Sequence, residues 1–329
     1  EAVNEVRDCV NGPPNFSTPE FMEEKAIELG KTNGYKVTVF KKKEIEKMGM
    51  GGIISVNRGS AKEARMLVLE YWPGKLVDKV FKKRPSPVVL VGKGIIFDSG
   101  GYNLKPSGHI EDMHLDKSGA AAVLGVFQLL KKLDVQVPVI GIAPITENCI
   151  DAVATKPSEI ITMHNGKTVE ITNTDAEGRL ILGDALSYAE KTYKPRYMVD
   201  IATLTGACMV ALGHRIAGVL GNDDDLIEQL KKAGTESDET VWHLPLTPDF
   251  EKAMKGEVTD LHNSDPDRYA GASKAAAFLK AFVGKTKWAH LDIAGPAYTK
   301  APKSYETKRG TGYGVRLLLK FLENLPPHE

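Results

Sequence analysis

The stretch "PVVLVGKGIIFDSGG", residues 87–101, decides the fold class of this 329-residue chain. It opens with an apolar run at residues 87–91 and continues as a glycine-rich loop that carries Lys93 and Asp98. Similar short runs recur along the chain, separated by helical patterns, and such alternation is typical of βαβ units. The sequence therefore predicts an α/β fold of three layers, with helices on both faces of a mostly parallel central sheet.

The expected strands lie at residues 87–91, 137–144, 197–203 and 288–293, and the expected helices near 117–133, 178–193, 223–233, 273–283 and 313–324. In the first of these helices, apolar residues follow the 3.6-residue period and predict a core-facing stripe. The stripe consists of Ala120, Val123, Leu124, Phe127, Leu130 and Leu133. We expect a single domain, with residues 1–80 as an opening segment that packs on the same sheet and contains a helix from about residue 18.

The composition excludes several classes of protein. Lys plus Arg and Asp plus Glu each number 43, so the formal net charge is zero, which disfavours a nucleic-acid partner. Cys9, Cys149 and Cys208 are widely spaced and form no CxxC pattern, which indicates neither a disulfide framework nor a thiolate zinc site. With no signal sequence and no membrane-length apolar run, we expect a soluble cytoplasmic protein.

Charged side chains alternate in "NTDAEGRL", residues 173–180. Asp175, Glu177 and Arg179 fall between an expected strand at 168–172 and the helix from 178. One reading is a solvated turn that feeds a helix, because Asp and Glu suit a helix start. A functional site is the other, and this stretch alone leaves both open.

Active sites of open α/β sheets lie at the carboxyl ends of the strands. The loop after residue 91 brings Lys93, Asp98 and Lys105 to this edge, and Asp116 precedes the next helix. Together with "NTDAEGRL", three segments bring four carboxylates, two lysines and an arginine toward one place. The sequence therefore predicts a charged cleft.

Four carboxylates in one cleft would repel each other, since two unit charges about 4 Å apart interact by about 4 kcal/mol at an effective dielectric of 20. Two divalent cations would balance the four charges and provide the site of a two-metal hydrolase. Lys93 would be an unusual ligand, because its amine must lose a proton to bind a metal, but nearby dications lower its pKa. Taken alone, Lys93 reads more simply as a strand-end lysine that reaches solvent.

Other nucleotide-binding and catalytic motifs are incomplete or absent. "GKGIIF" begins like a dinucleotide fingerprint but ends in Phe97, and a second glycine-rich turn follows in place of a helix. There is no P-loop and no HExxH, and "FDSGG" lacks the leading glycine of a nucleophile elbow. The eight histidines show no spacing typical of a metal pair.

Six segments together resemble the leucine aminopeptidases of the M17 type, also called cytosol aminopeptidases. They are "VGKGIIFDSGGYNLKP", "LDKSGAAAVLG", "NTDAEGRLILGDAL", "IATLTGA", "HLDIAG" and "GTGYGVRLL". The resemblance covers nearly the whole chain and implies a phosphorylase/hydrolase-like αβα fold with a dinuclear site for zinc or manganese, or for cobalt or magnesium. It also implies a homo-hexamer, and an N-terminal domain that relatives carry and that we expect to be absent here.

The resemblance assigns the metal ligands residue by residue. It implies that Lys93, Asp98, Asp116 and Glu177 hold the tightly bound ion, and that Asp98, Asp175 and Glu177 hold the more exchangeable one. Asp98 and Glu177 would bridge the two ions. A metal-activated water would then attack the scissile carbonyl of the substrate.

The remaining roles also come from the resemblance. Lys105 would stabilise the oxyanion, and Arg179 would hold a bicarbonate ion that shuttles protons. The backbone of Leu204 and Gly206 would contact substrate. The pocket for the first side chain is expected to be apolar and to suit leucine or methionine, with the lining residues Met113, Thr203, Ala294 and Ala297. Met113 could equally be a core residue.

The implied reaction is removal of the N-terminal residue from short peptides, because metals that bind a free α-amine select exopeptidase substrates. Three alternatives stay open. They are a cysteinylglycine-type dipeptidase, a DNA-binding regulatory role, which the neutral charge disfavours, and a scaffold in which metals only stabilise the fold. Lys105 and Arg179 argue against the scaffold, since a structural metal site needs neither.

Overall fold

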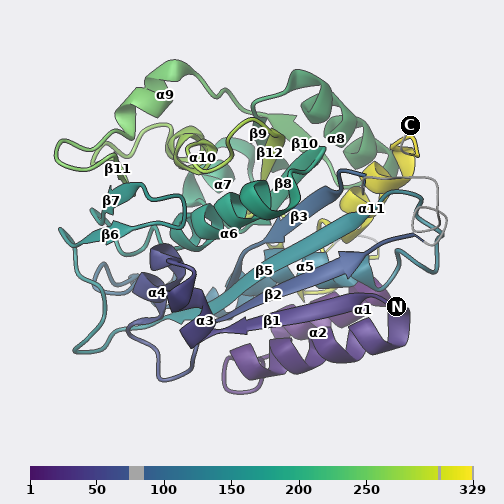
Figure 1. The fold of residues 1–329 in the computed structure, drawn as a ribbon, viewed down its shortest axis with the longest axis horizontal. Coiled ribbons are helices and arrows are strands. Elements are labelled where there is room, and N and C mark those ends of the chain that lie inside the picture. The colour runs from purple at the N-terminus through teal and green to yellow at the C-terminus, as the bar shows by residue number, and fades with distance from the viewer. Residues whose placement is uncertain (74–84, 303–304, 328–329) are drawn as a thin grey trace.

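A computed structural model describes residues 1–73, 85–302 and 305–327 of the chain. Its centre is a nine-stranded sheet in the order β1-β2-β5-β3-β8-β12-β9-β10, with β4 paired to β5 (Figure 1). The bounds are β1 Lys36–Lys41, β2 Arg65–Tyr71, β3 Val88–Gly92, β4 Gly94–Asp98, β5 Val139–Asn148, β8 Tyr197–Ala202, β9 Ala217–Gly221, β10 Val241–His243 and β12 Lys287–Asp292. The inner strands β5, β3, β8 and β12 are parallel, whereas β2 pairs antiparallel with β5 and β9 with β12. The predicted α/β class with a mostly parallel sheet is confirmed.

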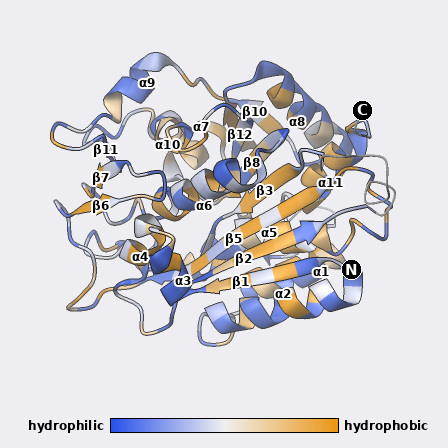
Figure 2. Ribbon diagram, in the orientation of Figure 1, coloured by the Kyte–Doolittle hydropathy of each residue, from blue (hydrophilic) through white to orange (hydrophobic). Residues whose placement is uncertain are grey.

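Helices cover both faces of this sheet, because successive strand residues point to opposite sides. Val88 and Leu90 of β3 belong to one buried cluster, and Val89 and Val91 belong to the other. The first cluster contains residues of α1 Ala2–Asn11, α2 Pro19–Asn33, α5 Ser118–Phe127, α8 Asp224–Ser237 and α11 Val315–Asn324. The second contains or packs against residues of α3 Lys42–Lys47, α4 Gly51–Asn57, α6 Gly178–Tyr193, α9 Pro248–Ala253 and α10 Gly271–Lys280. Figure 2 shows the central strands as the most apolar part of the ribbon.

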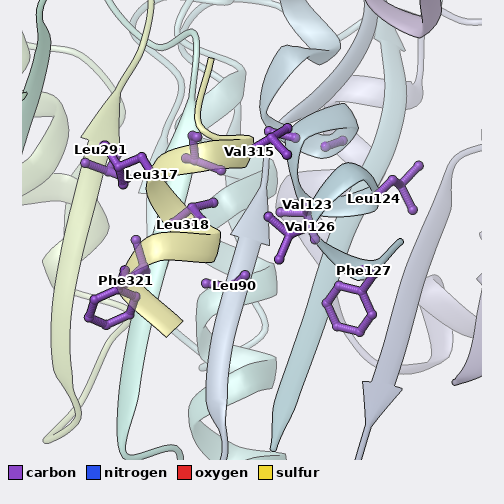
Figure 3. Packing of buried hydrophobic residues seen from close by; sticks show 14 of the residues in the cluster. Leu90, Val123, Leu124, Val126, Phe127, Leu291, Val315, Leu317, Leu318 and Phe321 are labelled. Atoms are coloured by element: carbon purple, nitrogen blue, oxygen red, sulfur yellow. The ribbon is translucent and has the colours of Figure 1, made fainter. Parts of the chain in front are cut away.

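The layer that contains α5 and α11 is packed closely against the middle of the sheet. Figure 3 shows Leu318 of α11 and Val126 of α5 on either side of Leu90 of β3. All ten residues of α5 are buried. Asp116 lies in the short 3-10 helix at 113–117 that leads directly into α5, so this packing gives it a rigid support.

Two smaller sheets and one further helix lie outside this core. β7 Thr168–Glu170 pairs with β6 Ile160–Thr162 and β11 Leu261–His262, at the left of Figure 1. β13 Tyr298–Thr299 pairs antiparallel with β14 Arg309–Gly310, and α7 Gly206–Leu212 follows β8. The strand expected at 168–172 therefore exists, but it belongs to a separate small sheet.

The regular pattern predicted some elements well and others poorly. The helix expected at 178–193 is α6 with the same bounds. The helix expected near 117–133 was wrong at its end, because regular α-helix stops at Phe127 and the amide of Leu129 bonds the carbonyl of Val126 in a tighter turn. As a result Leu133 is 48% exposed and does not belong to the core stripe.

The glycine-rich segment after β3 was also predicted wrongly as a loop throughout. It contains β4, whose parallel pairing with β5 is interrupted by a register shift between Ile95 and Asp98. Pairing with a distant strand stabilises this segment, and no local pattern reports such a partner.

The opening segment adds strands to the central sheet as well as packing on it. Its described part, residues 1–73, supplies β1 and β2, which extend the sheet by two antiparallel strands. The helix expected from about residue 18 is confirmed as α2, where the Thr18 hydroxyl accepts a hydrogen bond from the amide of Phe21 and Pro19 begins the helix. Residues 74–80 of the expected segment lie outside the described residues. Among the described helices, none combines the length and apolar character needed to cross a bilayer.

Glu239 joins α11 to the edge of the sheet. Its side chain is almost fully buried before β10, and its Oε2 accepts hydrogen bonds from the amides of Gly314 and Leu317 at 3.0 and 2.9 Å. Arg316 Nε lies 3.3 Å from the other carboxylate oxygen. These bonds satisfy amides at the start of α11 that the helix itself leaves unpaired.

Replacing Glu239 with alanine should lower the free energy of unfolding by about 1–3 kcal/mol, because buried amides of α11 would lose their acceptor. Urea unfolding of E239A measures this. Glu228→Ala on the exposed surface of α8 is the control, since it removes only a surface pair with Lys231. Equal stability of E239A and E228A would contradict the assignment.

Candidate metal centre and substrate cleft

The charged residues expected at the site meet at one edge of the sheet. Lys93 lies in the one-residue break between β3 and β4, and Asp98 ends β4. Asp116 lies in the short 3-10 helix η1 (Met113–Lys117), and Asp175 and Glu177 lie between β7 and α6. Because β3, β5 and β8 are parallel, their carboxyl ends share an edge, and the site lies there.

Two lysines lie among the four carboxylates. Lys93 Nζ is 2.8 Å from Asp116 Oδ2 and 2.8 Å from Glu177 Oε1. Lys105 Nζ is 2.8 Å from Asp98 Oδ2 and 2.6 Å from Asp175 Oδ1. Each lysine therefore bridges two acidic groups from different segments of the chain.

Three of these acidic groups form a cluster that could hold a metal ion. One carboxylate oxygen each from Asp98, Asp175 and Glu177 lies within 4.8 Å of the other two. Asp116 adds a fourth carboxylate, which is buried, and the buried Lys93 adds an amine. Oxygen donors with one amine are ligands that zinc, manganese and magnesium accept, so the donor set fits divalent cations.

The pKa shifts of the acidic groups also favour the binding of a cation. Burial raises the pKa of Asp116 to about 8, with Lys93 opposing this shift and Glu177 adding to it. Burial, together with the charges of Asp98 and Glu177, raises the pKa of Asp175 to about 6, with Lys105 opposing the shift. Four carboxylates face two lysines here, so additional positive charge would be stabilised.

Lys93 is not the solvent-exposed lysine of the simpler reading. It is 3% exposed, and an alanine Cβ at Gly178 would lie only 2.5 Å from its Cε. Burial by itself lowers the pKa of Lys93, but Asp116 and Glu177 outweigh it and raise the pKa above its usual value. The glycine of "NTDAEGRL" therefore provides the space that this side chain occupies.

Thr203 connects the strand β8 to both ligand segments. Its hydroxyl donates to Asp116 Oδ1 at 2.6 Å, and its carbonyl accepts from Lys93 Nζ at 3.0 Å. It also lines the cleft, where it was expected. Thr203 thus orients two candidate ligands in addition to contacting the cleft.

Two buried residues that the sequence reasoning missed support the site through hydrogen bonds to its residues. Asn148, at the end of β5, donates from Nδ2 to Asp98 Oδ1 at 2.8 Å and to the carbonyl of Thr174 at 3.1 Å. Asp292, at the end of β12, is fully buried and accepts hydrogen bonds from the amide of Leu204 and the hydroxyl of Thr205. Asn148 follows the strand predicted at 137–144 and Asp292 lies near the end of the one predicted at 288–293, so their positions near the carboxyl edge were the available signal.

Arg179 lies in the first turn of α6 and is 9% exposed. Its Nη1 donates to the carbonyl of Asn263 at 2.8 Å, while its buried Nε has no hydrogen-bond partner among the described residues. Burial lowers the pKa of Arg179 to about 10, so it remains a cation at neutral pH. A buried guanidinium with a spare donor suits a small anion.

The site opens into a cavity of about 1010 Å³. Of the residues singled out from the sequence, the cavity is lined by Lys93, Asp98, Lys105, Met113, Asp116, Asp175, Glu177, Arg179, Thr203, Leu204, Gly206 and Ala294. Met113 therefore faces the cavity. A cavity of this size accommodates a short peptide.

Ala297 lies elsewhere. It is 2% exposed, belongs to the core cluster on the α5 side of the sheet, and its amide bonds the carbonyl of Ile293. The neighbouring Tyr298 lines the cavity. The expectation that Ala297 lines the pocket was wrong, because the turn after β12 directs its short side chain into the core.

Comparison with known proteins gives the relationship. A model of the cytosol aminopeptidase family, catalytic domain, matches residues 4–319. The chain belongs to the cytosol aminopeptidase family. A probable cytosol aminopeptidase of Geobacter sulfurreducens is 48% identical over 323 residues, which cover 98% of this chain and 63% of that protein. One from Geobacter sp. (strain M21) is 46% identical over 320 residues, covering 97% of this chain and 63% of that protein.

A third relative, a probable cytosol aminopeptidase of Nitrosomonas europaea, is 45% identical over 317 residues. These residues cover 96% of this chain and 61% of that relative. The chain thus spans less than two thirds of the length of the relatives it matches. Members of the family are metal-dependent aminopeptidases, which agrees with the acidic cluster of this site.

Replacing Lys93 with methionine should lower the free energy of unfolding in chelator by about 3–5 kcal/mol, because Asp116 and Glu177 would lose the cation that pairs with them. Urea unfolding in EDTA measures this. Lys300→Met is the control, because Lys300 forms only an exposed pair with Asp112. If K93M were as stable as K300M, the buried lysine would not be the counter-ion of the site.

Proposed function

We propose that this chain is a two-metal aminopeptidase that removes the N-terminal residue, preferably leucine, methionine or another apolar residue, from short peptides. The observation that supports this most directly is the cluster of Asp98, Asp175 and Glu177 beside Lys105 in one cavity. Family membership supports the reaction class. The cavity supports a substrate of peptide size.

In this proposal Lys93, Asp98, Asp116 and Glu177 hold one divalent ion, and Asp98, Asp175 and Glu177 hold a second. Zinc or manganese suits these ligands best, with cobalt or magnesium as further options. When bound, such ions polarise a carbonyl and lower the pKa of water, which supplies the nucleophile. The residues of the chain then orient the substrate and carry the charges.

Lys105 is proposed to stabilise the oxyanion that forms as the peptide carbonyl is attacked. Its Nζ lies beside Asp98 and Asp175, so its positive charge faces the place where a substrate held at these groups would react. Arg179 is proposed to hold bicarbonate, which would accept and return a proton. Its unpaired Nε supports this role, because a planar anion needs such a donor.

The acidic cleft also accounts for the proposed exopeptidase selectivity. A free α-amine carries positive charge or a lone pair toward this region, whereas an internal peptide nitrogen offers neither. The backbone of Leu204 and Gly206 would contact the main chain of the substrate. Met113, Thr203 and Ala294 would surround its first side chain.

The chain is further proposed to act in the cytoplasm, as a homo-hexamer whose catalytic domains contain residues 4–319. Three free cysteines fit a reducing compartment, and the names of the relatives place those proteins in the cytosol. The hexamer rests on the family resemblance. Light scattering of the purified chain measures the assembly directly.

The chain should release p-nitroaniline from leucine p-nitroanilide when Mn²⁺ or Zn²⁺ is supplied, and EDTA should abolish the release. The matched control is N-acetyl-leucine p-nitroanilide, which has the same side chain without the free amine and should not be cleaved. Metal-independent release, or equal cleavage of the acetylated substrate, would refute the proposal.

Substitutions within the site should separate the roles of its residues. Glu177→Ala should abolish hydrolysis, because it removes a ligand of both ions. Lys105→Ala should lower kcat by about a hundredfold or more through loss of oxyanion stabilisation, and Arg179→Ala should lower it less. Steady-state kinetics under saturating metal test this order, and an active E177A variant would contradict the ligand assignment.

A further inference from the structure

Asn263 is a buried residue outside the proposed ligand set. It forms several hydrogen bonds with the ligand loop, the segment from Ile171 to Glu177 that carries Asp175 and Glu177. It follows β11 directly and is 0% exposed. Its side-chain Oδ1 accepts from the amide of Thr172 at 2.8 Å and from the amide of Asn173 at 3.2 Å. Its Nδ2 donates to the carbonyls of Asn173 and Ala176 at 2.6 and 3.4 Å.

The main chain of Asn263 extends the same contact in both directions. Its amide donates to the carbonyl of Glu170 at 3.0 Å, at the end of β7. Its carbonyl accepts from Arg179 Nη1 at 2.8 Å, in the first turn of α6. One residue from a distant part of the chain thus contacts the end of β7, the loop that follows it and the first turn of α6.

The loop that Asn263 contacts has few bonds of its own. It runs from Ile171 to Glu177 and contains Asp175 and Glu177. Its internal side-chain bond is from the amide of Asp175 to Asn173 Oδ1 at 2.8 Å. Buried amides and carbonyls without partners are costly, so the loop depends on outside groups to fix its path.

A second anchor holds the other side of the same loop. Thr174 donates its amide to Asn103 Oδ1 at 2.8 Å, and the amide of Asn103 donates to the Thr174 hydroxyl at 2.8 Å. These bonds tie the loop to the segment after β4. Asn263 alone, of the two asparagines, also contacts Arg179, so it relates the ligands to the proposed anion site.

We infer that Asn263 is a positioning residue that fixes Asp175, Glu177 and Arg179 relative to one another. The inference rests on the proposed function, because it assigns Asn263 to the metal site that the function requires. Groups that orient ligands commonly change metal affinity or activity by about 10- to 100-fold when removed. A residue that only stabilised the fold would leave the metal affinity of the folded protein unchanged.

The test is isothermal titration calorimetry of Mn²⁺ into the chelator-treated 329-residue chain, together with kcat and KM on leucine p-nitroanilide. Asn263→Ala should weaken Mn²⁺ binding at the weaker site by about tenfold or more and lower kcat more than it raises KM. Asn57→Ala is the matched control. Asn57 is a buried asparagine that clamps another loop, through bonds from Nδ2 to the carbonyl of Lys62 and to Thr146. N57A should lose thermal stability and keep the Mn²⁺ affinity of the original chain.

Thr172→Val provides a milder variant that keeps the shape of the side chain. It removes the Thr172 hydroxyl, which donates to Asn263 Oδ1 at 3.2 Å and also exchanges hydrogen bonds with the carbonyl and the amide of Ser264. T172V should weaken Mn²⁺ binding by about threefold or more, because the contact with Asn263 and both bonds to Ser264 are lost. In a chain that already carries N263A its effect on Mn²⁺ affinity should be smaller than in the original chain, because the part that passes through Asn263 is already lost.

The outcomes separate the inference from the proposed function. If the original chain binds no Mn²⁺, the proposed function fails, and the inference fails with it. If the original chain binds Mn²⁺ and hydrolyses the substrate, but N263A and T172V do so equally well, only the inference is overturned. Equal losses of affinity in N263A and N57A would overturn it as well, since a general loss of packing would then explain the result.

Discussion

Repulsion among buried carboxylates is the constraint on which the rest of this structure depends. Asp98, Asp116, Asp175 and Glu177 come from three separate segments. Burial removes the water that would screen three of them, and the Asp175 side chain is 33% exposed. Lys93 and Lys105 each lie between two of these groups. Even so, four carboxylates face only these two lysines, and burial together with neighbouring carboxylates raises the pKa values of Asp116 and Asp175. A site of this kind keeps its geometry only if the surrounding fold holds the segments in place.

The sheet provides this support through its parallel inner strands. β3, β8 and β12 end at the same edge, so the residues that follow them meet without long connections. The two core clusters fix the strands from both faces, and Figure 3 shows how α5 and α11 pack over β3. Thr203, directly after β8, donates a hydrogen bond from its hydroxyl to Asp116 in η1. This bond fixes the position of a candidate metal ligand relative to the sheet.

The architecture and most of the charged site could be predicted from the sequence, because both produce regular patterns of residues. Apolar runs that alternate with helical periods predicted β3, β8 and α6, and charged residues after those runs indicated the cleft. β1 and β2 were missed although "KVTVFK" and "RMLVLEY" carry strand-like runs, whereas β4 lies in a glycine-rich segment whose pairing with β5 shifts register between Ile95 and Asp98. Ala297 was misplaced for a related reason, since the direction of one side chain after β12 depends on how the following turn packs.

Three of the supporting residues that sequence reasoning missed are asparagines, and their shared chemistry explains their place. Asn103, Asn148 and Asn263 fix the ligand loops with neutral amide groups. An amide offers both a donor and an acceptor, so it can satisfy backbone amides and carbonyls together. A lysine or glutamate in the same positions would change the net charge beside four carboxylates and alter the affinity of the site for cations. Asparagine therefore determines the shape of the site and leaves its charge to the ligands themselves. Because such residues carry no charge pattern, the sequence indicates at most that they lie near a strand end, and only the folded structure shows what they hold.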